Sequence, residues 1–348
     1  MSKTRVSLVG LGATGVAIGN VLARRTDVSL QGGADPRPGL VGKDLGSVLG
    51  GQELGVTVVD SSACLPDADV AVVATSSMLD VVAETVAPLL ERGINVVSIC
   101  EELAYPHVSH PRLARQLDEL ARQNGVTLLG TGANPGIIMD TLPLLLSSMT
   151  QQAHRVVIRR SADMSRYGAI LEKFGLGLTP EQFGLAQRRG AVIGHVGFEQ
   201  SVAALGAGLG WRLDEIEVDD VRPVRITDRA RHGRRRSLEA GTVSAVRHAA
   251  RGLIADHAVI DLEINFGFFE PGDDIAPGDR CRIEGVDQNI EVAATAGYES
   301  HLSTVAVTAN VVTAVAEAPP GLRSMAELPV VSFASRGAWT NVDQRGQP

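Results

Sequence analysis

The chain has 348 residues, of which 44% are hydrophobic and 3% aromatic, so it is long enough for two domains and a sizeable core. Its net charge of −8 and its pI near 5.5 argue against general nucleic-acid binding. The cysteines (Cys64, Cys100 and Cys281) are too far apart for a disulfide framework or a zinc site, and we see neither a signal-peptide region nor a membrane span. We therefore expect a cytoplasmic protein without a membrane partner.

The first 135 residues alternate between short β-rich runs and helical stretches, which predicts a parallel sheet. The expected strands are Val6–Val9, Val28–Gly32, Val56–Val59, Val70–Ala74, Asn95–Ile99 and Thr127–Gly130. The expected helices are Ala13–Arg25, Met78–Arg92 and His110–Asn124. Right-handed crossovers between such elements give an α/β, doubly wound Rossmann sheet, and we expect residues 1–135 to form a dinucleotide-binding domain.

The turn after the first strand carries the most specific signal in the chain. Gly10 permits a tight turn, Gly12 lets the backbone approach a pyrophosphate, and Gly15 lets the following helix pack closely on the sheet. Ala13 and Thr14 complete this turn, at a helix N-terminus that offers N–H groups to phosphates. Twenty residues later, Asp35 is spaced to bind the adenosine ribose, which favours NAD.

Three further strand ends, at Ala74–Ser77, Cys100–Pro106 and Gly130–Gly136, carry polar residues where ligands of such sheets bind. The loop Ala74, Thr75, Ser76 and Ser77 leaves room for a ribose and a nicotinamide, and Cys100 ends the next strand. Glu101 and Glu102 follow it directly, and a partly buried carboxylate there is suited to exchanging protons. Acids that open a helix also complement its dipole, so a purely structural role stays open.

After the stretch Ala133–Gly136 the pattern changes to longer, antiparallel-style strands. Residues 136–301 are expected to form an α+β domain with an open, largely antiparallel sheet, and 302–334 to return to the nucleotide domain before a loose tail at 335–348. The expected strands are Arg155–Arg160, Glu215–Arg225, Gly241–Ala250, Ala258–Phe268, Arg280–Gly285 and Gln288–Ala296. The expected helices are Ile137–Ser148, one that begins at Thr179, Gly197–Leu209 and Leu302–Ala316.

The remaining polar residues give weaker signals. His195 and Tyr167 are candidates for lining a substrate pocket, although a satisfied structural histidine is an equal alternative for His195. The histidines show no metal-ligand spacing, so we predict no metal. The basic run Arg229–Arg236 is interpreted as a solvated loop between strands, because no aromatic residues interleave with it.

Four motifs carry a resemblance to a known family. They are Glu101–Pro106 (EELAYP), Gly130–Gly136 (GTGANPG), Gly194–Gly197 with Leu209–Trp211, and Ala309-Asn310 followed by Ala318–Gly321. Together they resemble the 2,4-diaminopentanoate dehydrogenase group, which includes the native NAD(P)-dependent amine dehydrogenases and is distantly similar to dihydrodipicolinate reductase. The likeness spans nearly the whole chain.

The resemblance implies a homodimer, a substrate-binding second domain and a catalytic glutamate in the 101–102 pair. We place that role on Glu102, with Glu101 as the alternative. Cofactor contacts are expected from Asn134 and Asn310, and substrate contacts from Tyr105, Pro135, Ile138, Tyr167 and His195. The segment Arg160–Tyr167 lacks the basic cluster typical of the family, and Val312 stands where the family has proline. The His-His-x-x-Lys motif of dihydrodipicolinate reductases is also missing.

The expected function is that of an NAD(P)-dependent amine dehydrogenase, which interconverts an amine with a carbonyl compound plus ammonia. A glutamate would accept the amine proton, stabilise the iminium cation and activate water. Asp35 favours NAD and Arg37 partly offsets this toward NADP, so we expect NAD to be preferred or both to be used. The alternatives are an ammonia-independent imine or carbonyl reductase and a non-catalytic NAD(P)-binding sensor.

Overall fold

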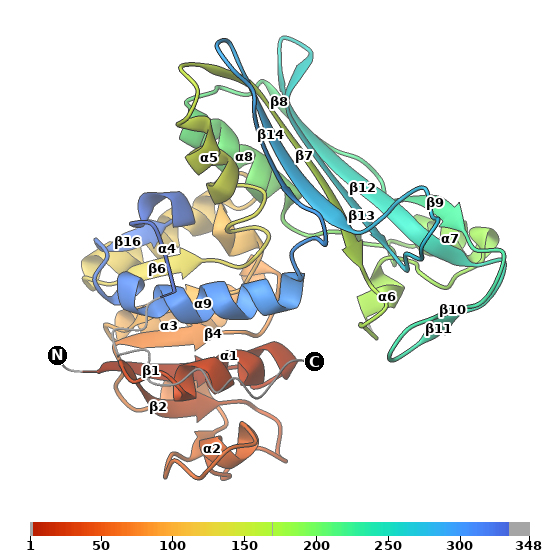
Figure 1. Cartoon of the computed structure of the whole chain (residues 1–348). Coiled ribbons are helices and arrows are strands. Elements are labelled where there is room, and N and C mark those ends of the chain that lie inside the picture. Colours follow the sequence, from red (N-terminus) through yellow and green to blue (C-terminus); the bar gives the residue numbers. More distant parts are fainter. Residues whose placement is uncertain (1–2, 169, 334–348) are drawn as a thin grey trace. The chain divides into compact units, whose positions relative to one another are not determined.

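The computed structural model describes residues 3–168 and 170–333, and these form two compact units (Figure 1). Unit 1 combines the chain up to residue 133 with the described residues from 301 onward, and unit 2 comprises residues 134–300. The expected domain boundaries after residues 135 and 301 lie within two residues of these divisions. The expected loose tail at 335–348 lies outside the described residues.

Unit 1 is built on a sheet of seven parallel strands in the order β3-β2-β1-β4-β5-β6-β16. The strands are β1 Thr4–Val9, β2 Val28–Ala34, β3 Val58–Val59, β4 Val70–Val73, β5 Asn95–Ser98, β6 Thr127–Gly130 and β16 Gly321–Arg323. Strand order 3-2-1-4-5-6 is that of the Rossmann fold, which confirms the predicted doubly wound sheet. Strand β16 was not predicted, because a three-residue edge strand leaves no periodic pattern in the sequence.

The helices of unit 1 cover strands whose valine-rich sequences are buried on both faces, as parallel sheets require. They are α1 Ala13–Ala23, α2 Leu45–Val48, α3 Leu79–Glu91, α4 Pro111–Gln123 and α9 Ser300–Ala316, with 3₁₀ turns η1 Ser62–Cys64, η2 Glu102–Ala104 and η3 Met325–Glu327. A continuous apolar core joins α3 and α4 to the sheet, with Val82, Leu89 and Ala121 fully buried. The predicted helices over 13–25, 78–92 and 110–124 are confirmed to within two residues at each end.

Unit 2 contains an open sheet in the order β15-β14-β7-β13-β12-β8, with β9 also paired to β12. The strands are β7 Ala153–Asp163, β8 Glu215–Val218, β9 Arg222–Ile226, β12 Val243–Ile254, β13 His257–Gly267, β14 Gly278–Gly285 and β15 Ile290–Ala294. Strands β7 and β13 pair in parallel and the other pairs are antiparallel, which confirms a largely antiparallel sheet. The single strand expected over 215–225 was wrong: it divides into β8 and β9, which pair with different parts of β12.

Within the described residues of unit 2, four helices accompany this sheet. They are α5 Thr141–Ser147, α6 Ile170–Lys173, α7 Pro180–Arg188 and α8 Phe198–Leu209. The helix predicted from residue 137 begins four residues later, since Asp140 caps α5 and residues 136–140 form turns. The predicted start at Thr179 is confirmed by a complete capping box with Gln182.

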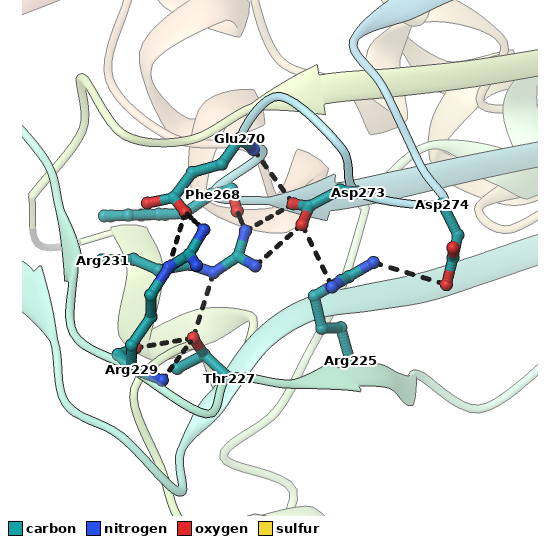
Figure 2. Close-up of polar contacts among 8 residues, drawn as sticks. All are labelled: Arg225, Thr227, Arg229, Arg231, Phe268, Glu270, Asp273 and Asp274. Atoms are coloured by element: carbon teal, nitrogen blue, oxygen red, sulfur yellow. Dashed lines mark hydrogen bonds and ion pairs between the residues drawn. The ribbon is translucent and has the colours of Figure 1, made fainter.

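The basic run at 229–236 is not simply a solvated loop, and that interpretation is corrected here. Figure 2 shows two of its arginines, Arg229 and Arg231, turned toward acidic residues of the 270–274 loop. Arg231 is 2% exposed; its guanidinium donates to both carboxylate oxygens of Asp273 and to the Phe268 carbonyl. Arg229 pairs with Glu270 at 2.7 Å. The run therefore fastens the short hairpin β10 Arg231–His232 and β11 Ser237–Leu238 to the neighbouring loop.

Candidate active site

The glycine turn between β1 and α1 has the shape that a bound pyrophosphate requires. Gly10 has φ of +85°, and a Cβ on Gly15 would lie 1.9 Å from the Gly10 carbonyl oxygen, so both positions need glycine. A Cβ on Gly12 would meet no atom within 4 Å, which leaves open space over the helix N-terminus. Ala13 and Thr14 form the first turn of α1 there. These residues fit a dinucleotide phosphate held by backbone N–H groups.

Asp35 and Arg37 close one side of this turn. Asp35 lies at the end of β2 and is 6% exposed; it accepts the Leu11 N–H at 2.8 Å. Arg37 binds the same carboxylate through its side chain at 2.8 Å and also donates to the Leu11 carbonyl at 2.8 Å. Hydrogen bonds from Arg37 lower the pKa of Asp35 to about 2, so this carboxylate is ionised at neutral pH.

The loop that follows β4 lies beside the glycine turn, at the point where the strand order reverses. A Cβ on Gly10 would come within 2.6 Å of the Ala74 carbonyl oxygen, so the two strand ends are in contact. Thr75 is exposed, whereas Ser76 accepts the Met78 N–H at 3.1 Å and so helps to start α3. Their expected cofactor contacts stay predictions, made at the position where ligands bind in such sheets.

Cys100 at the end of β5 is fully buried, and its thiol donates to the Ser77 carbonyl at 3.1 Å. Burial raises the pKa of this thiol to about 12, so it stays protonated. The side chain thus packs beneath the loop, and any contact of Cys100 with the cofactor would have to come from its backbone.

Glu102 projects from the same strand end toward the start of α3. Its Oε2 accepts the Leu79 N–H at 2.6 Å, which satisfies one of the unpaired donors of that helix. The Nε2 atom of His110 lies 3.9 Å from this oxygen and 3.7 Å from a carboxylate oxygen of Asp80. The Glu102 side chain is 12% exposed, and its Oε1 makes no hydrogen bond to the described residues.

The neighbours of Glu102 along the chain are also partly shielded. Glu101 is half-buried at the start of the η2 turn. Tyr105 is half-buried beside His107, with ring centroids 5.2 Å apart, and burial raises the pKa of its hydroxyl. The EELAYP motif thus places two carboxylates and a phenol at one strand end of unit 1.

In unit 2 the structure joins Asn134, expected at the cofactor, to His195, expected at the substrate. The Asn134 amide Nδ2 and the His195 ring Nε2 are 2.8 Å apart. The backbone N–H of His195 donates to the ring Nδ1 of His248 at 2.9 Å. Burial lowers the pKa of His195 to about 3, so its imidazole is neutral at physiological pH. His195 is therefore suited to hydrogen bonding and not to carrying a positive charge.

Asp140 organises the turn that contains Asn134 and Pro135. Its buried carboxylate accepts the Gly136 N–H and the Thr141 N–H, each at 2.7 Å, and the Ser201 hydroxyl at 3.1 Å. Burial raises the pKa of this carboxyl group. The peptide bond between Asn134 and Pro135 is cis.

The other expected contact residues lie in different surroundings. Ile138 is 5% exposed and lines a small cavity together with Leu142, Ile158 and Cys281. The Tyr167 hydroxyl donates to the carboxylate of Glu299. Asn310 is half-buried on α9 in unit 1. The ligand contacts proposed for these three residues stay predictions.

Three residues that shape these surroundings were not predicted as site residues from the sequence. His110 was visible only as the start of a helix, and Asp140 only as a charge within an apolar run. His248 sits in a strand and meets His195 across 53 residues of sequence. Periodicity does not show these contacts, because they depend on side-chain direction and two of them join distant segments: His195 to His248, and Asp140 to Ser201 across 61 residues.

Between residues 3 and 333, residue 169 apart, no group of three or more His, Cys, Asp or Glu side chains has a geometry that holds a metal ion. In the same residues no helix has the length and apolar character needed to cross a membrane.

Comparison with known proteins places the chain among dehydrogenases. Residues 137–343 match the model of the 2,4-diaminopentanoate dehydrogenase C-terminal domain. The chain is 31% identical over 335 residues to 2,4-diaminopentanoate dehydrogenase of Acetoanaerobium sticklandii, and the alignment covers 95% of this chain and 94% of that protein.

Solved structures agree. An amine dehydrogenase from Mycobacterium smegmatis superposes with a TM-score of 0.82 at 27% identity, over 96% of this chain and 98% of that one. A probable dehydrogenase from Thermotoga maritima shares the fold at 13% identity, with a TM-score of 0.56 over 93% of this chain and 92% of that one. The chain belongs to the 2,4-diaminopentanoate dehydrogenase family of NAD(P)-dependent amine dehydrogenases.

Proposed function

We propose that the chain interconverts a primary amine with a carbonyl compound plus ammonia, and that Glu102 is the residue that handles the amine proton. The names of its relatives support amine-bearing substrates, one of them a diamino acid. The observation that carries the role of Glu102 is its anchoring: Leu79 fixes one carboxylate oxygen at 2.6 Å, and the other oxygen has no partner in the described part of the chain. A carboxylate held in this way is positioned for proton transfer.

Glu102 would act at three stages of the reaction. A bound nicotinamide would supply the hydride acceptor, and the glycine turn with Arg37, which Asp35 orients, would hold its dinucleotide. Glu102 accepts a proton from the substrate ammonium, because only the neutral amine has a lone pair to assist hydride loss. Glu102 then releases this proton to solvent, so that its restored negative charge stabilises the substrate iminium. Finally it takes a proton from the water that attacks the iminium carbon.

The first test compares Glu102→Gln with Glu101→Gln. In Glu102→Gln the new amide oxygen can still accept the Leu79 N–H, so the loop should keep its structure while it loses the proton acceptor. We expect kcat for reductive amination to fall by at least about 100-fold in Glu102→Gln, with cofactor affinity unchanged. Normal turnover by this variant together with an inactive Glu101→Gln would move the role to Glu101.

The reaction itself is tested by following NADH and NADPH oxidation with a panel of ketones and aldehydes, each with and without excess ammonium. Oxidation that requires ammonium supports reductive amination and ranks the substrates. Oxidation that is indifferent to ammonium would contradict the proposal and indicate imine or carbonyl reduction. Cofactor binding without oxidation of NADH or NADPH in the presence of any member of the panel would favour a sensor.

A further inference from the structure

The carboxylate of Asp35 has no hydrogen-bonding capacity left for a ribose. Its Oδ1 accepts the backbone N–H and the Nε of Arg37 at 3.0 and 2.8 Å. Its Oδ2 accepts the Leu11 N–H and the Nη2 of Arg37, both at 2.8 Å. An ionised carboxylate offers about four acceptor positions, and these four bonds fill them. The ribose hydroxyls of NAD would have to displace an existing donor, so Asp35 does not select NAD in this arrangement.

Arg37, the partner of Asp35, uses only some of its side-chain N–H groups in the contacts that hold it. Three of its five side-chain N–H groups bind Asp35 and the Leu11 carbonyl. The two on Nη1 have no partner within residues 3–168 and 170–333, and the side chain is 56% exposed. The guanidinium is thus fixed beside the glycine turn, just after β2, with two donors that make no hydrogen bond to the described residues.

We infer that Arg37 binds the 2′-phosphate of the adenosine ribose and that the chain prefers NADP to NAD. Asp35 is a positioning residue in this arrangement: it orients the guanidinium, and its own charge is already neutralised. A guanidinium matches phosphate oxygens in both charge and geometry. The inference rests on the nicotinamide dependence of the family and not on the proposed role of Glu102, so either can fail without the other.

The test measures binding, without turnover, by isothermal titration calorimetry. The ligands are 5′-AMP and 2′,5′-ADP, which differ only in the 2′-phosphate, and the full cofactors NAD⁺ and NADP⁺. We expect each 2′-phosphorylated ligand to bind the wild-type protein about 10- to 100-fold more tightly than its partner, the usual contribution of charge-assisted hydrogen bonds. In Arg37→Ala this ratio should fall to near 1, and NAD⁺ should bind at least as tightly as before, because two acceptor positions on Asp35 become vacant.

Arg24→Ala is the matched control. Arg24 is an exposed arginine at the C-terminal end of α1, away from the glycine turn, so its loss removes the same charge and should leave the ratio unchanged. Two results would overturn the inference. One is equal or tighter binding of the ligands without a 2′-phosphate to the wild-type protein. The other is an equal loss of affinity for both nucleotides in Arg37→Ala, which would mean that Arg37 holds a group common to them.

Discussion

At the scale of single residues, the glycines of the first turn have different physical tasks. Gly15 is required by the fold, because a Cβ there would lie 1.9 Å from a backbone carbonyl oxygen that cannot move away cheaply. Gly12 is not required by any protein contact, since its Cβ position is empty to 4 Å. Its glycine is therefore best explained by the approach of a ligand.

This difference predicts opposite behaviour for Gly12→Ala and Gly15→Ala. Gly12 has φ of −67° and ψ of −174°, which alanine adopts without strain, so Gly12→Ala should keep its thermal midpoint but bind dinucleotide more weakly. Gly15→Ala should lower stability by about 1–3 kcal/mol, the usual cost of overpacking. Differential scanning fluorimetry with and without NADP⁺ separates the two effects. Unchanged cofactor affinity in Gly12→Ala would show that the pyrophosphate binds elsewhere.

At the scale of elements, ion pairs hold the segment 227–238 against the neighbouring 270–274 loop. The Asp273 side chain is 6% exposed; it accepts hydrogen bonds from Arg231 and from the Glu270 N–H at 2.9 Å, and it forms an ion pair with Arg225 at 3.1 Å (Figure 2). The Arg231 guanidinium holds the pKa of Asp273 well below its usual range. A buried pair of this kind depends on both partners, because either charge alone would be costly.

We expect Asp273→Asn to lower the free energy of unfolding by about 3 kcal/mol or more at pH 7, because Arg231 would remain buried without its counter-charge. The folded-state pKa of Asp273 is depressed, so its stabilisation is present above the unfolded value of about 4 and is lost as the pH falls below it. The difference between wild type and variant should therefore shrink between pH 5 and pH 3 in urea titrations.

Asp274→Asn is the control for this prediction. Asp274 also pairs with Arg225, at 3.5 Å, but its side chain is 99% exposed, so its removal should have little effect at either pH. Equal effects of the two variants, or a gap for Asp273→Asn that stays constant with pH, would contradict the role given to the buried pair.

At the scale of the whole molecule, unit 1 is assembled from both ends of the described chain. Strand β16 pairs in parallel with β6, and the Leu322 N–H donates to Asp118 on α4 at 2.9 Å. On α9, Thr304 accepts the Ala133 N–H at 3.1 Å, and Val311, Val312 and Val315 are fully buried. The nucleotide-binding fold is therefore complete only after unit 2 has been synthesised.

This organisation predicts which strands are destabilised when a buried side chain of α9 is truncated. Val312→Ala removes two buried methyl groups and should destabilise unit 1 by about 2 kcal/mol. Hydrogen exchange should show faster exchange in β4 and β6, some 200 residues before the mutation, and a smaller change in β12 and β13. Faster exchange confined to β12 and β13 would contradict the assignment of α9 to unit 1.

The sequence by itself determined the alternation of strands and helices, the glycine turn and the family motifs, because these depend on local spacing and on the period of apolar residues. It also placed Glu102 and Asp35 at strand ends. Their partners were decided only by the tertiary structure: Leu11 meets Asp35 across 24 residues, Leu79 meets Glu102 across 23, and Asn134 meets His195 across 61. Such bonds depend on side-chain direction after the strands have paired, so a linear pattern shows the candidate groups but not which of their donor and acceptor positions remain open to a ligand.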